Sequence, residues 1–122
     1  MNNTISTNIP PTSDDHGYCA TIGFFDGVHR GHQFLISKLT EMAHASGRKS
    51  MVITFDRHPR QVVQTDYVPR LITSLDEKLR LLAATDADRV ETLHFDAAMA
   101  ALPARLFMQN VLHDRLGVSL LM

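Results

Sequence analysis

One short segment near the N-terminus constrains the fold more than any other part of the chain. Residues Gly23–His32 read G-F-F-D-G-V-H-R-G-H, between the apolar run Cys19–Ile22 and an amphipathic segment that begins near Gln33. An apolar run, a glycine-rich turn and an amphipathic segment, in that order, predict a strand, a tight turn and a helix. We therefore expect the chain to be organised around a strand–turn–helix unit.

The residues of this turn predict a polyphosphate site. Gly27 and Gly31 permit a positive φ angle or leave room above the backbone for a ligand. The helix expected from about Gly31 directs its first N–H groups and the positive end of its dipole into the same space. His29 and His32 flank the helix start, and each imidazole can donate a hydrogen bond to a phosphate oxygen.

Other interpretations of the same residues stay open. His29 and His32 are spaced as two metal ligands, although no further ligand stands at a helpful spacing, and they also suit unligated structural histidines. Asp26 suits a substrate contact or a hydrogen bond within its own turn. Gly23 and Gly27 are also compatible with an ordinary tight turn.

The segments that follow predict a parallel α/β fold. Apolar residues at helical spacing predict a helix that ends near Gly47, with its buried face formed by Phe34, Leu35, Leu39, Met42 and Ala43. The unbroken apolar run that ends at Phe55 is typical of a strand covered on both sides in a parallel sheet. Together with the first strand, these elements complete a β-α-β unit.

The connection over residues 56–73 is longer than loops in compact domains usually are. It begins next to the flat apolar face of Phe55 and carries His58, Pro59 and Arg60, which supply hydrogen-bonding, stiffening and cationic groups. In open α/β sheets such a loop leaves the carboxyl end of a strand, where ligands bind, so we expect it beside the histidine turn. A solvated connection with scattered arginines remains the alternative.

The second half of the chain predicts two more helix–strand units. Ser74 and Glu77 form a capping box that opens a helix to about Ala84. A strand exposed on one side, at a sheet edge, is expected over Arg89–Phe95. A helix from Pro103 to Leu116 and a strand over Val118–Met122 follow. Crossover rules place the first strand centrally, with the second and third strands on one side and the fourth on the other.

Composition excludes several classes of protein. The 122 residues are 44% hydrophobic and 20% charged, which is typical of one globular domain or part of one. A net charge of −1 disfavours nucleic acid as a principal partner. No apolar run is long enough to span a bilayer and no signal-peptide pattern is present, so we expect no membrane association and a cytoplasmic location. The single cysteine, Cys19, excludes a disulfide framework. Residues 1–17 are polar and predict a flexible lead-in.

The turn also carries a resemblance to a known family. D-G-V-H-R-G-H after a short strand is similar to the H-x-G-H signature of the nucleotidylyltransferase superfamily, and the longer form G-F-F-D-G-V-H-R-G-H resembles the prokaryotic FAD synthetases. These are usually bifunctional riboflavin kinase and FMN adenylyltransferase enzymes. The resemblance covers residues 18–122 and continues through T-F-D-R-H-P at Thr54–Pro59, S-L-D-E-K-L-R-L-L at Ser74–Leu82 and L-G-V at Leu116–Val118.

The resemblance implies a Rossmann-like α/β fold with a mostly parallel sheet and flanking helices, and a reaction in which AMP passes from ATP to FMN with Mg²⁺ present. It implies catalytic roles for His29 and His32. The implied ATP-binding residues are Gly23, Phe24, Phe25, Asp26, Gly27, His29, Gly31 and His32. The implied flavin-binding residues are Phe55, His58, Pro59 and Arg60. The chain departs from the family at Arg57, where proline is common, which bears on the stiffness of the loop.

Segments that the family carries after the last predicted strand, G-x-D-x-x-F-G and I-S-S-T-x-x-R, are absent. We therefore expect residues 18–122 to be the N-terminal portion of an adenylyltransferase domain, with a fold incomplete at the C-terminus. The uncovered outer edge of the fourth strand then predicts a homodimer formed by edge pairing. Three functions compete: a flavin adenylyltransferase domain that lacks full activity unless the missing segments are supplied, another H-x-G-H nucleotidylyltransferase, and a non-catalytic nucleotide-binding or assembly module.

Overall fold

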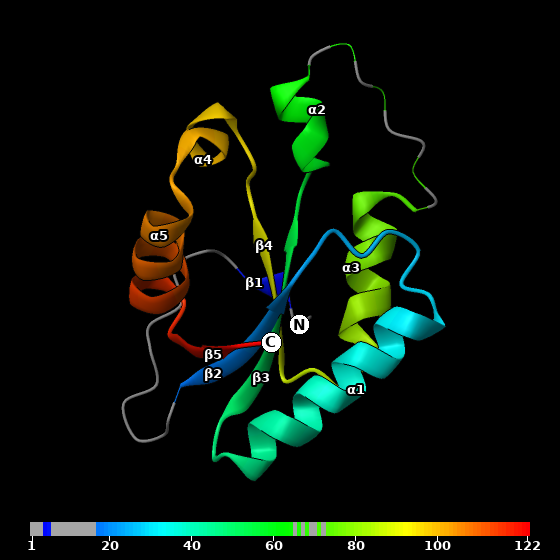
Figure 1. Ribbon diagram of the computed structural model, residues 1–122. Helices are drawn as coiled ribbons and strands as arrows, with labels where there is room; N and C mark the ends of the chain where they lie inside the picture. Colours follow the sequence, from blue (N-terminus) through cyan, green and yellow to red (C-terminus); the bar gives the residue numbers. More distant parts are fainter. Residues whose placement is uncertain (1–3, 6–16, 65, 67, 69–70, 72) are drawn as a thin grey trace.

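The computed structural model describes residues 4–5, 17–64, 66, 68, 71 and 73–122, and these form an α/β fold with a parallel sheet between two layers of helices (Figure 1). The strands are β1 (Thr4–Ile5), β2 (Tyr18–Ile22), β3 (Lys49–Phe55), β4 (Arg89–Leu93) and β5 (Val118–Leu121). The helices are α1 (Arg30–Ala45), α2 (Pro59–Val63), α3 (Leu75–Ala83), α4 (Ala97–Ala101), α5 (Ala104–Leu106) and the π-helix η1 (Phe107–Arg115).

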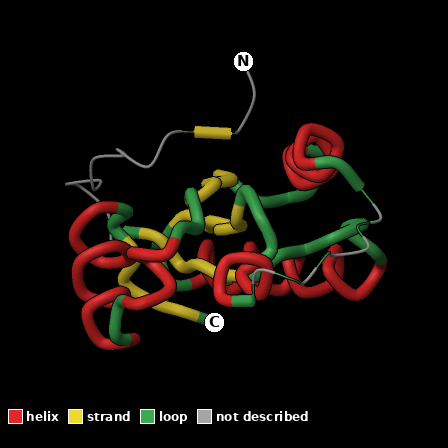
Figure 2. The backbone as a smooth tube through the Cα atoms, turned by 90° about the horizontal axis from the view of Figure 1, so that it is seen from above, coloured by secondary structure: helices red, strands yellow, loops and turns green. Residues whose placement is uncertain are grey.

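The sheet order confirms the predicted arrangement of the four main strands. The order is β1-β4-β3-β2-β5 and every pairing is parallel, so β2 lies between β3 and β5. The expectation of a sheet edge at β4 is wrong, because Thr4 and Ile5 of the lead-in pair with Val90 and Glu91. Figure 2 shows β1 and the chain end at β5 on opposite sides of the sheet.

The two faces of the sheet form two cores. Successive strand residues point to opposite faces. One face packs against η1 through Tyr18, Ala20, Met51, Ile53, Leu93, Val111, Leu112 and Leu116. The other packs against α1 and α3 through Cys19, Val52, Val90, Ile36, Leu39, Ala43 and Leu82. The predicted site residues lie at the carboxyl edge of the sheet, where β2 leads into the turn before α1 and β3 leads into the long connection.

The buried face of α1 differs from the predicted one by about one residue. Ile36, Leu39, Thr40 and Ala43 are buried, whereas Phe34 is 66% exposed. Thr40 explains this orientation, because its hydroxyl donates a hydrogen bond of 3.0 Å to Ser50 Oγ in β3. A polar contact thus fixes the rotation of a helix whose apolar pattern alone suits two neighbouring faces.

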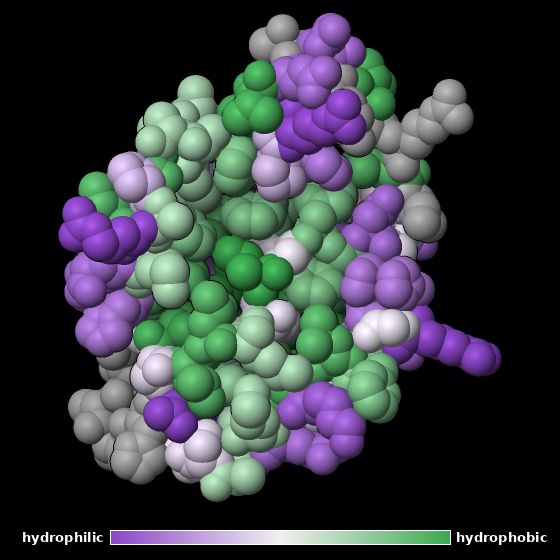
Figure 3. All heavy atoms as spheres, viewed as in Figure 1, coloured by the Kyte–Doolittle hydropathy of each residue, from purple (hydrophilic) through white to green (hydrophobic). Residues whose placement is uncertain are grey.

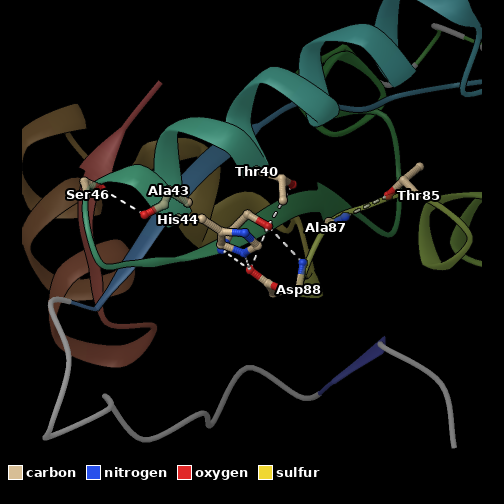
Figure 4. A network of polar contacts seen from close by, with 8 residues as sticks. Thr40, Ala43, His44, Ser46, Thr85, Ala87 and Asp88 are labelled. Carbon is tan, nitrogen blue, oxygen red and sulfur yellow. Dashed lines mark hydrogen bonds and ion pairs between the residues drawn. The ribbon is translucent and has the colours of Figure 1, made fainter.

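A polar network joins the amino ends of β3 and β4 to α1 (Figure 4). Asp88 accepts hydrogen bonds of 2.8 Å and 3.2 Å from the backbone N–H and the hydroxyl of Ser50, and His44 Nε2 lies 2.8 Å from the same carboxylate. Burial raises the pKa of Asp88, but the bonds from Ser50 and His44 outweigh it and hold that pKa below its usual value. The network lies at the amino ends of these strands, opposite the carboxyl ends where the predicted site residues lie.

The later helices differ in detail from expectation. The helix was predicted with Pro103 as its first residue, but it begins one residue later, at Ala104, with Pro103 as its N-cap. It winds as a π-helix from Phe107 onwards and ends before Gly117, which has a φ angle of 75°. The short helices α2 and α4 were not predicted. Within the described ranges, none of the helices has the length and hydrophobicity needed to cross a membrane.

Candidate functional site

The turn between β2 and α1 has an unusual backbone. Phe25, Gly27 and Val28 have φ angles of 56°, 79° and 43°, in the left-handed region that glycine favours. The side chains of Phe25 and Val28 are buried in the core beneath α1, which holds this conformation in place. Backbone strain of this kind costs on the order of 1–3 kcal/mol per residue and concentrates at functional sites.

His29 is the N-cap of α1. Its Nδ1 accepts hydrogen bonds from the backbone N–H groups of Gly31 at 3.0 Å and His32 at 3.4 Å. An Nδ1 that accepts must carry its lone pair, so the proton of the neutral ring sits on Nε2. His29 is exposed, and its Nε2–H group is therefore an outward-facing donor at the start of a 16-residue helix.

This geometry changes the expected role of the helix start. Two of the N–H groups expected to face a phosphate are already bonded to the His29 ring. Gly31 does not adopt a positive φ angle. It provides space instead, since a Cβ at this position would lie 2.9 Å from His29 Cε1. The His29 imidazole thus stands between the helix N-terminus and any anion.

His32 stacks on His29. The ring centroids lie 3.6 Å apart with the planes inclined by 22°. The rings of Phe25 and His32 are nearly perpendicular, with their centroids 5.2 Å apart. Burial, followed by the neighbouring His29, lowers the pKa of His32 against an opposing effect of Asp26. Its Nδ1 is buried and, among the described residues, has no hydrogen-bond partner. The lowered pKa leaves His32 neutral at pH 7.

Asp26 connects the turn to the distant end of the long connection. Its Oδ1 accepts hydrogen bonds of 3.0 Å from both the backbone N–H and the hydroxyl of Thr73, and the Thr73 hydroxyl accepts one of 3.3 Å from Gly27 N–H. Asp26 therefore makes a contact across 47 positions of sequence, which neither interpretation of the turn had predicted.

The beginning of the connection also lies at the turn. The rings of Phe24 and His58 are 5.0 Å apart, and Thr54 donates a hydrogen bond of 2.9 Å to the carbonyl oxygen of Phe24. His58 is the N-cap of α2, accepting a bond of 3.1 Å from Arg60 N–H. The expectation that this loop lies beside the histidine turn is confirmed for its described ends. Residues 65, 67, 69–70 and 72 lie outside the described residues.

An apolar cavity of about 270 Å³ opens at the carboxyl ends of β3 and β4. Phe55 and Phe95 meet there edge to face, with their centroids 5.2 Å apart. The remaining lining residues are Met99, Ala100, Leu102, Ala104 and Phe107. Of the four residues implied for flavin binding, only Phe55 lines this cavity. Pro59 and Arg60 lie on α2, where Arg60 Nε donates to Gln64 at 2.9 Å.

The structure adds one residue that sequence reasoning missed. Lys78 of α3 is buried, and its ammonium group lies 3.7 Å from the centroid of the Phe24 ring. Its position was nonetheless readable, because Lys78 stands three residues after Leu75 and four before Leu82, on the buried face of the predicted helix. The aromatic and aliphatic residues around Phe55 gave no comparable signal, since they come from separate segments.

The chain is similar to several known proteins. A family model described as FAD synthetase matches residues 12–122. A bifunctional riboflavin kinase/FMN adenylyltransferase of Escherichia coli (strain K12) is 41% identical over 86% of this chain and 34% of its own length. Proteins of the same name from Pseudomonas fluorescens and Listeria monocytogenes are 36% and 32% identical, over 86% and 89% of this chain. The chain therefore spans about a third of the length of these relatives.

A solved structure shares the fold. The crystal structure of a Streptococcus pneumoniae protein, described as a macrolide-efflux protein, aligns with a TM-score of 0.77 at 25% sequence identity, over 99% of this chain and 41% of that one. This likeness agrees with the Rossmann-like α/β fold expected from the sequence. Because the family model matches nearly the whole sequence, this chain belongs to the FAD synthetase family.

Proposed function

We propose that the chain is the N-terminal portion of an FMN adenylyltransferase domain, which transfers AMP from ATP to FMN to give FAD and pyrophosphate in FAD biosynthesis. Family membership supports the reaction, as do the names of the relatives. The observation that carries it is the stacked pair of imidazoles at the start of α1, in which the Nδ1 of His29 is bonded to the helix N-terminus.

In the proposed reaction an FMN phosphate oxygen bonds to the α-phosphorus of ATP, and the bond from that phosphorus to the bridging oxygen of pyrophosphate breaks. Negative charge grows on the bridging and pyrophosphate oxygens. His29 and His32 donate hydrogen bonds to them, which stabilises the transition state without any proton transfer. Loss of either donor lowers the rate by about 10²–10³.

The backbone of the turn serves as the ATP-binding surface in this proposal. Gly23, Gly27 and Gly31 keep side chains away from the path of the phosphates, and Phe24 offers an apolar ring. Phe25 and Asp26 contribute by holding the turn in shape, since Phe25 is buried and Asp26 is bonded to Thr73.

The flavin ring is proposed to enter the apolar cavity beside Phe55. The aromatic rings of Phe55 and Phe95 suit a flat heterocycle, and a lining of aliphatic side chains excludes water from it. His58, Pro59 and Arg60 would then line the way from the cavity towards the histidine turn, where Arg60 can meet the FMN phosphate. Phe24 and His58 supply the contact between these two parts of the site.

ATP is proposed to enter as its Mg²⁺ complex. In the part of the chain that the structure describes, no group of three or more His, Cys, Asp or Glu side chains is arranged to hold a metal ion. We therefore assign no step of the reaction to residues that would bind a metal. The proposal includes a cytoplasmic location, where ATP and FMN are available, and no nucleic acid partner.

The experiment is a substrate screen. The chain is incubated with Mg²⁺–ATP and FMN, and FAD is quantified by chromatography. Parallel reactions contain CTP with phosphocholine, or ATP with phosphopantetheine. FAD formation that falls by at least 10² in His32→Ala supports the proposal. Turnover of another pair identifies a different H-x-G-H enzyme, and binding of nucleotide without turnover, also after the remaining part of the adenylyltransferase domain has been appended, identifies a binding module.

We also propose that the outer edge of β5 pairs with a second copy of the chain. Among the described strands β5 is the last in the sheet, and Leu120, Leu121 and Met122 are exposed along it. Figure 3 shows the molecule from the same side as Figure 1, in which β5 is labelled, and hydrophobic side chains gather over the middle of this face. Sedimentation should show a dimer that Leu121→Lys dissociates, and a monomer at high concentration would contradict the pairing.

A further inference from the structure

Lys78 is a buried lysine with few polar contacts. Its side chain is 2% exposed, although lysine almost always keeps its ammonium group in water. Its Nζ donates a hydrogen bond of 2.9 Å to the carbonyl oxygen of Phe55 and lies 3.7 Å from the centroid of the Phe24 ring. Burying an ammonium group is costly unless its contacts offset the loss of water, and these two contacts offset part of that cost.

The charges around Lys78 do not replace the lost water. Burial lowers its pKa to about 8, and the more distant carboxylates of Asp26 and Asp56 only partly oppose this. The ammonium group therefore depends on a ring face and a carbonyl oxygen rather than on a close ion pair. A methionine would fill the same space in the core without this cost.

The two contacts join the two halves of the candidate site. Phe24 belongs to the turn between β2 and α1, whereas Phe55 ends β3 and lines the apolar cavity. The Phe24 ring also contacts His58, at the start of the long connection. Lys78 thus touches both the predicted phosphate turn and the predicted flavin side.

The helix that carries Lys78 is itself anchored to the turn. Thr73, two residues before α3, is bonded to Asp26 and Gly27, and Ser74 caps the helix by accepting a hydrogen bond of 3.2 Å from Glu77 N–H. These bonds fix the position of α3 relative to the turn independently of the contact between Lys78 and Phe55 at the end of β3.

We propose that Lys78 is a positioning residue that holds the Phe24 ring against His58 and so fixes the spacing between the phosphate turn and the flavin cavity. This inference rests on the proposed function for its consequence in ligand binding. It assigns Lys78 no contact with either substrate. Its removal therefore affects how ATP and FMN binding are coupled more than it affects ATP binding alone.

The test compares Lys78→Met with Lys38→Met. Lys38 is a matched control, because its ammonium group lies over Phe34 at 5.6 Å on the exposed face of α1. The first readout is the nuclear Overhauser effect between the Phe24 and His58 rings in the ligand-free protein. We expect Lys78→Met to weaken this signal, and Lys38→Met to leave it unchanged.

The second readout is calorimetric. FMN affinity is measured with and without saturating Mg²⁺–ATP. We expect Lys78→Met to reduce the coupling between the two ligands by about tenfold, with ATP affinity alone changed less than threefold. An unchanged ring contact, an unchanged coupling in the folded variant, or an equal effect of Lys38→Met would overturn the inference. The ring contact in the ligand-free protein tests the positioning role of Lys78 even if no nucleotide binds. Failure of this inference can therefore be distinguished from failure of the proposed function.

A third measurement applies if Lys78→Met does not fold. Raising the pH of the parent protein from 6.5 to 9.5 removes the charge of Lys78, and the Phe24 ring resonances should shift with a midpoint near pH 8. Lys78→Arg, which keeps a cation and a donor, should retain the Phe24–His58 contact and lose this midpoint. Phe24 resonances that do not respond over this range would contradict the assignment.

Discussion

His29 performs two separable tasks, and two substitutions distinguish them. Its Nδ1 caps α1 through the N–H groups of Gly31 and His32, whereas its Nε2–H group is proposed to meet phosphate. His29→Ala removes both functions. His29→Asn retains a good N-cap acceptor but does not place a donor where Nε2 stands, so its effect on stability and its effect on ligand binding should diverge.

The magnitudes follow from the contacts. Replacing a capping side chain by alanine costs about 1 kcal/mol of unfolding free energy, which for a domain of this size lowers the melting temperature by about 4 °C. Both variants also lose the stacking contact with His32, so the difference between Ala and Asn isolates the cap. Losing a hydrogen bond to a charged phosphate costs about 1.5–3 kcal/mol, which weakens ATP binding about 10- to 100-fold in both variants.

The assay pairs urea unfolding, followed by circular dichroism, with ATP titration. We expect His29→Asn to be more stable than His29→Ala by about 1 kcal/mol and equally poor at binding ATP. Equal stabilities would refute the capping role of Nδ1. Retained ATP affinity in His29→Asn would refute the role of the Nε2–H group.

Three further predictions concern neighbouring and remote groups. Gly31→Ala should displace the His29 ring, because the new Cβ would lie against it, and should weaken ATP binding about tenfold. The free energy of unfolding should change by no more than about 1 kcal/mol, because alanine favours a helix. An unchanged ATP affinity, measured by calorimetry, would contradict this prediction. Asp88→Ala should lower the free energy of unfolding by about 1–2 kcal/mol at pH 7, because Asp88 accepts hydrogen bonds from Ser50. This difference from the parent should disappear as the pH falls through the lowered pKa of the folded carboxyl, since the protonated group no longer gains from these bonds. A difference that stays constant down to pH 2.5 would count against the prediction. Burial raises the pKa of Glu91 to about 7 against Arg89, so the folded state holds an extra proton between about pH 4.3 and 7 and the parent loses stability as the pH rises through that window. The free energy of unfolding of Glu91→Gln, relative to that of the parent, should therefore rise by up to about 3 kcal/mol as the pH increases from 4 to 8. A difference between the two proteins that stays the same at every pH, measured by urea unfolding, would disprove this.

The elements set by local signals were predictable from sequence. The apolar run before Gly23, the turn glycines and the capping box at Ser74 each determine nearby backbone, and the structure has a strand, a turn and a helix at those places. Crossover rules then placed the four main strands, because parallel connections have one hand. Contacts between distant segments were not readable. The bonds of Asp26 to Thr73 and of Thr40 to Ser50 depend on how the finished elements pack, so neither could be predicted from the sequence.

The candidate site divides in the same way. His29 and His32 were identified by spacing around a glycine, but the capping bond that directs the His29 ring depends on the rotamer of the side chain. The pairing of Thr4 and Ile5 with β4 gave no signal, since two residues of a polar lead-in carry no period. Phe55 was found through a motif, whereas Phe95 joined it only because β3 and β4 are neighbours.

The most direct measurement of the central claim is calorimetric titration of the chain with Mg²⁺–ATP and then with FMN, beside the double variant His29→Ala/His32→Ala. Circular dichroism first establishes that both proteins are folded. The account predicts that the parent chain binds ATP and that the double variant loses this binding. Equal ATP affinities of the two proteins would contradict the assignment of the histidine turn as the phosphate site.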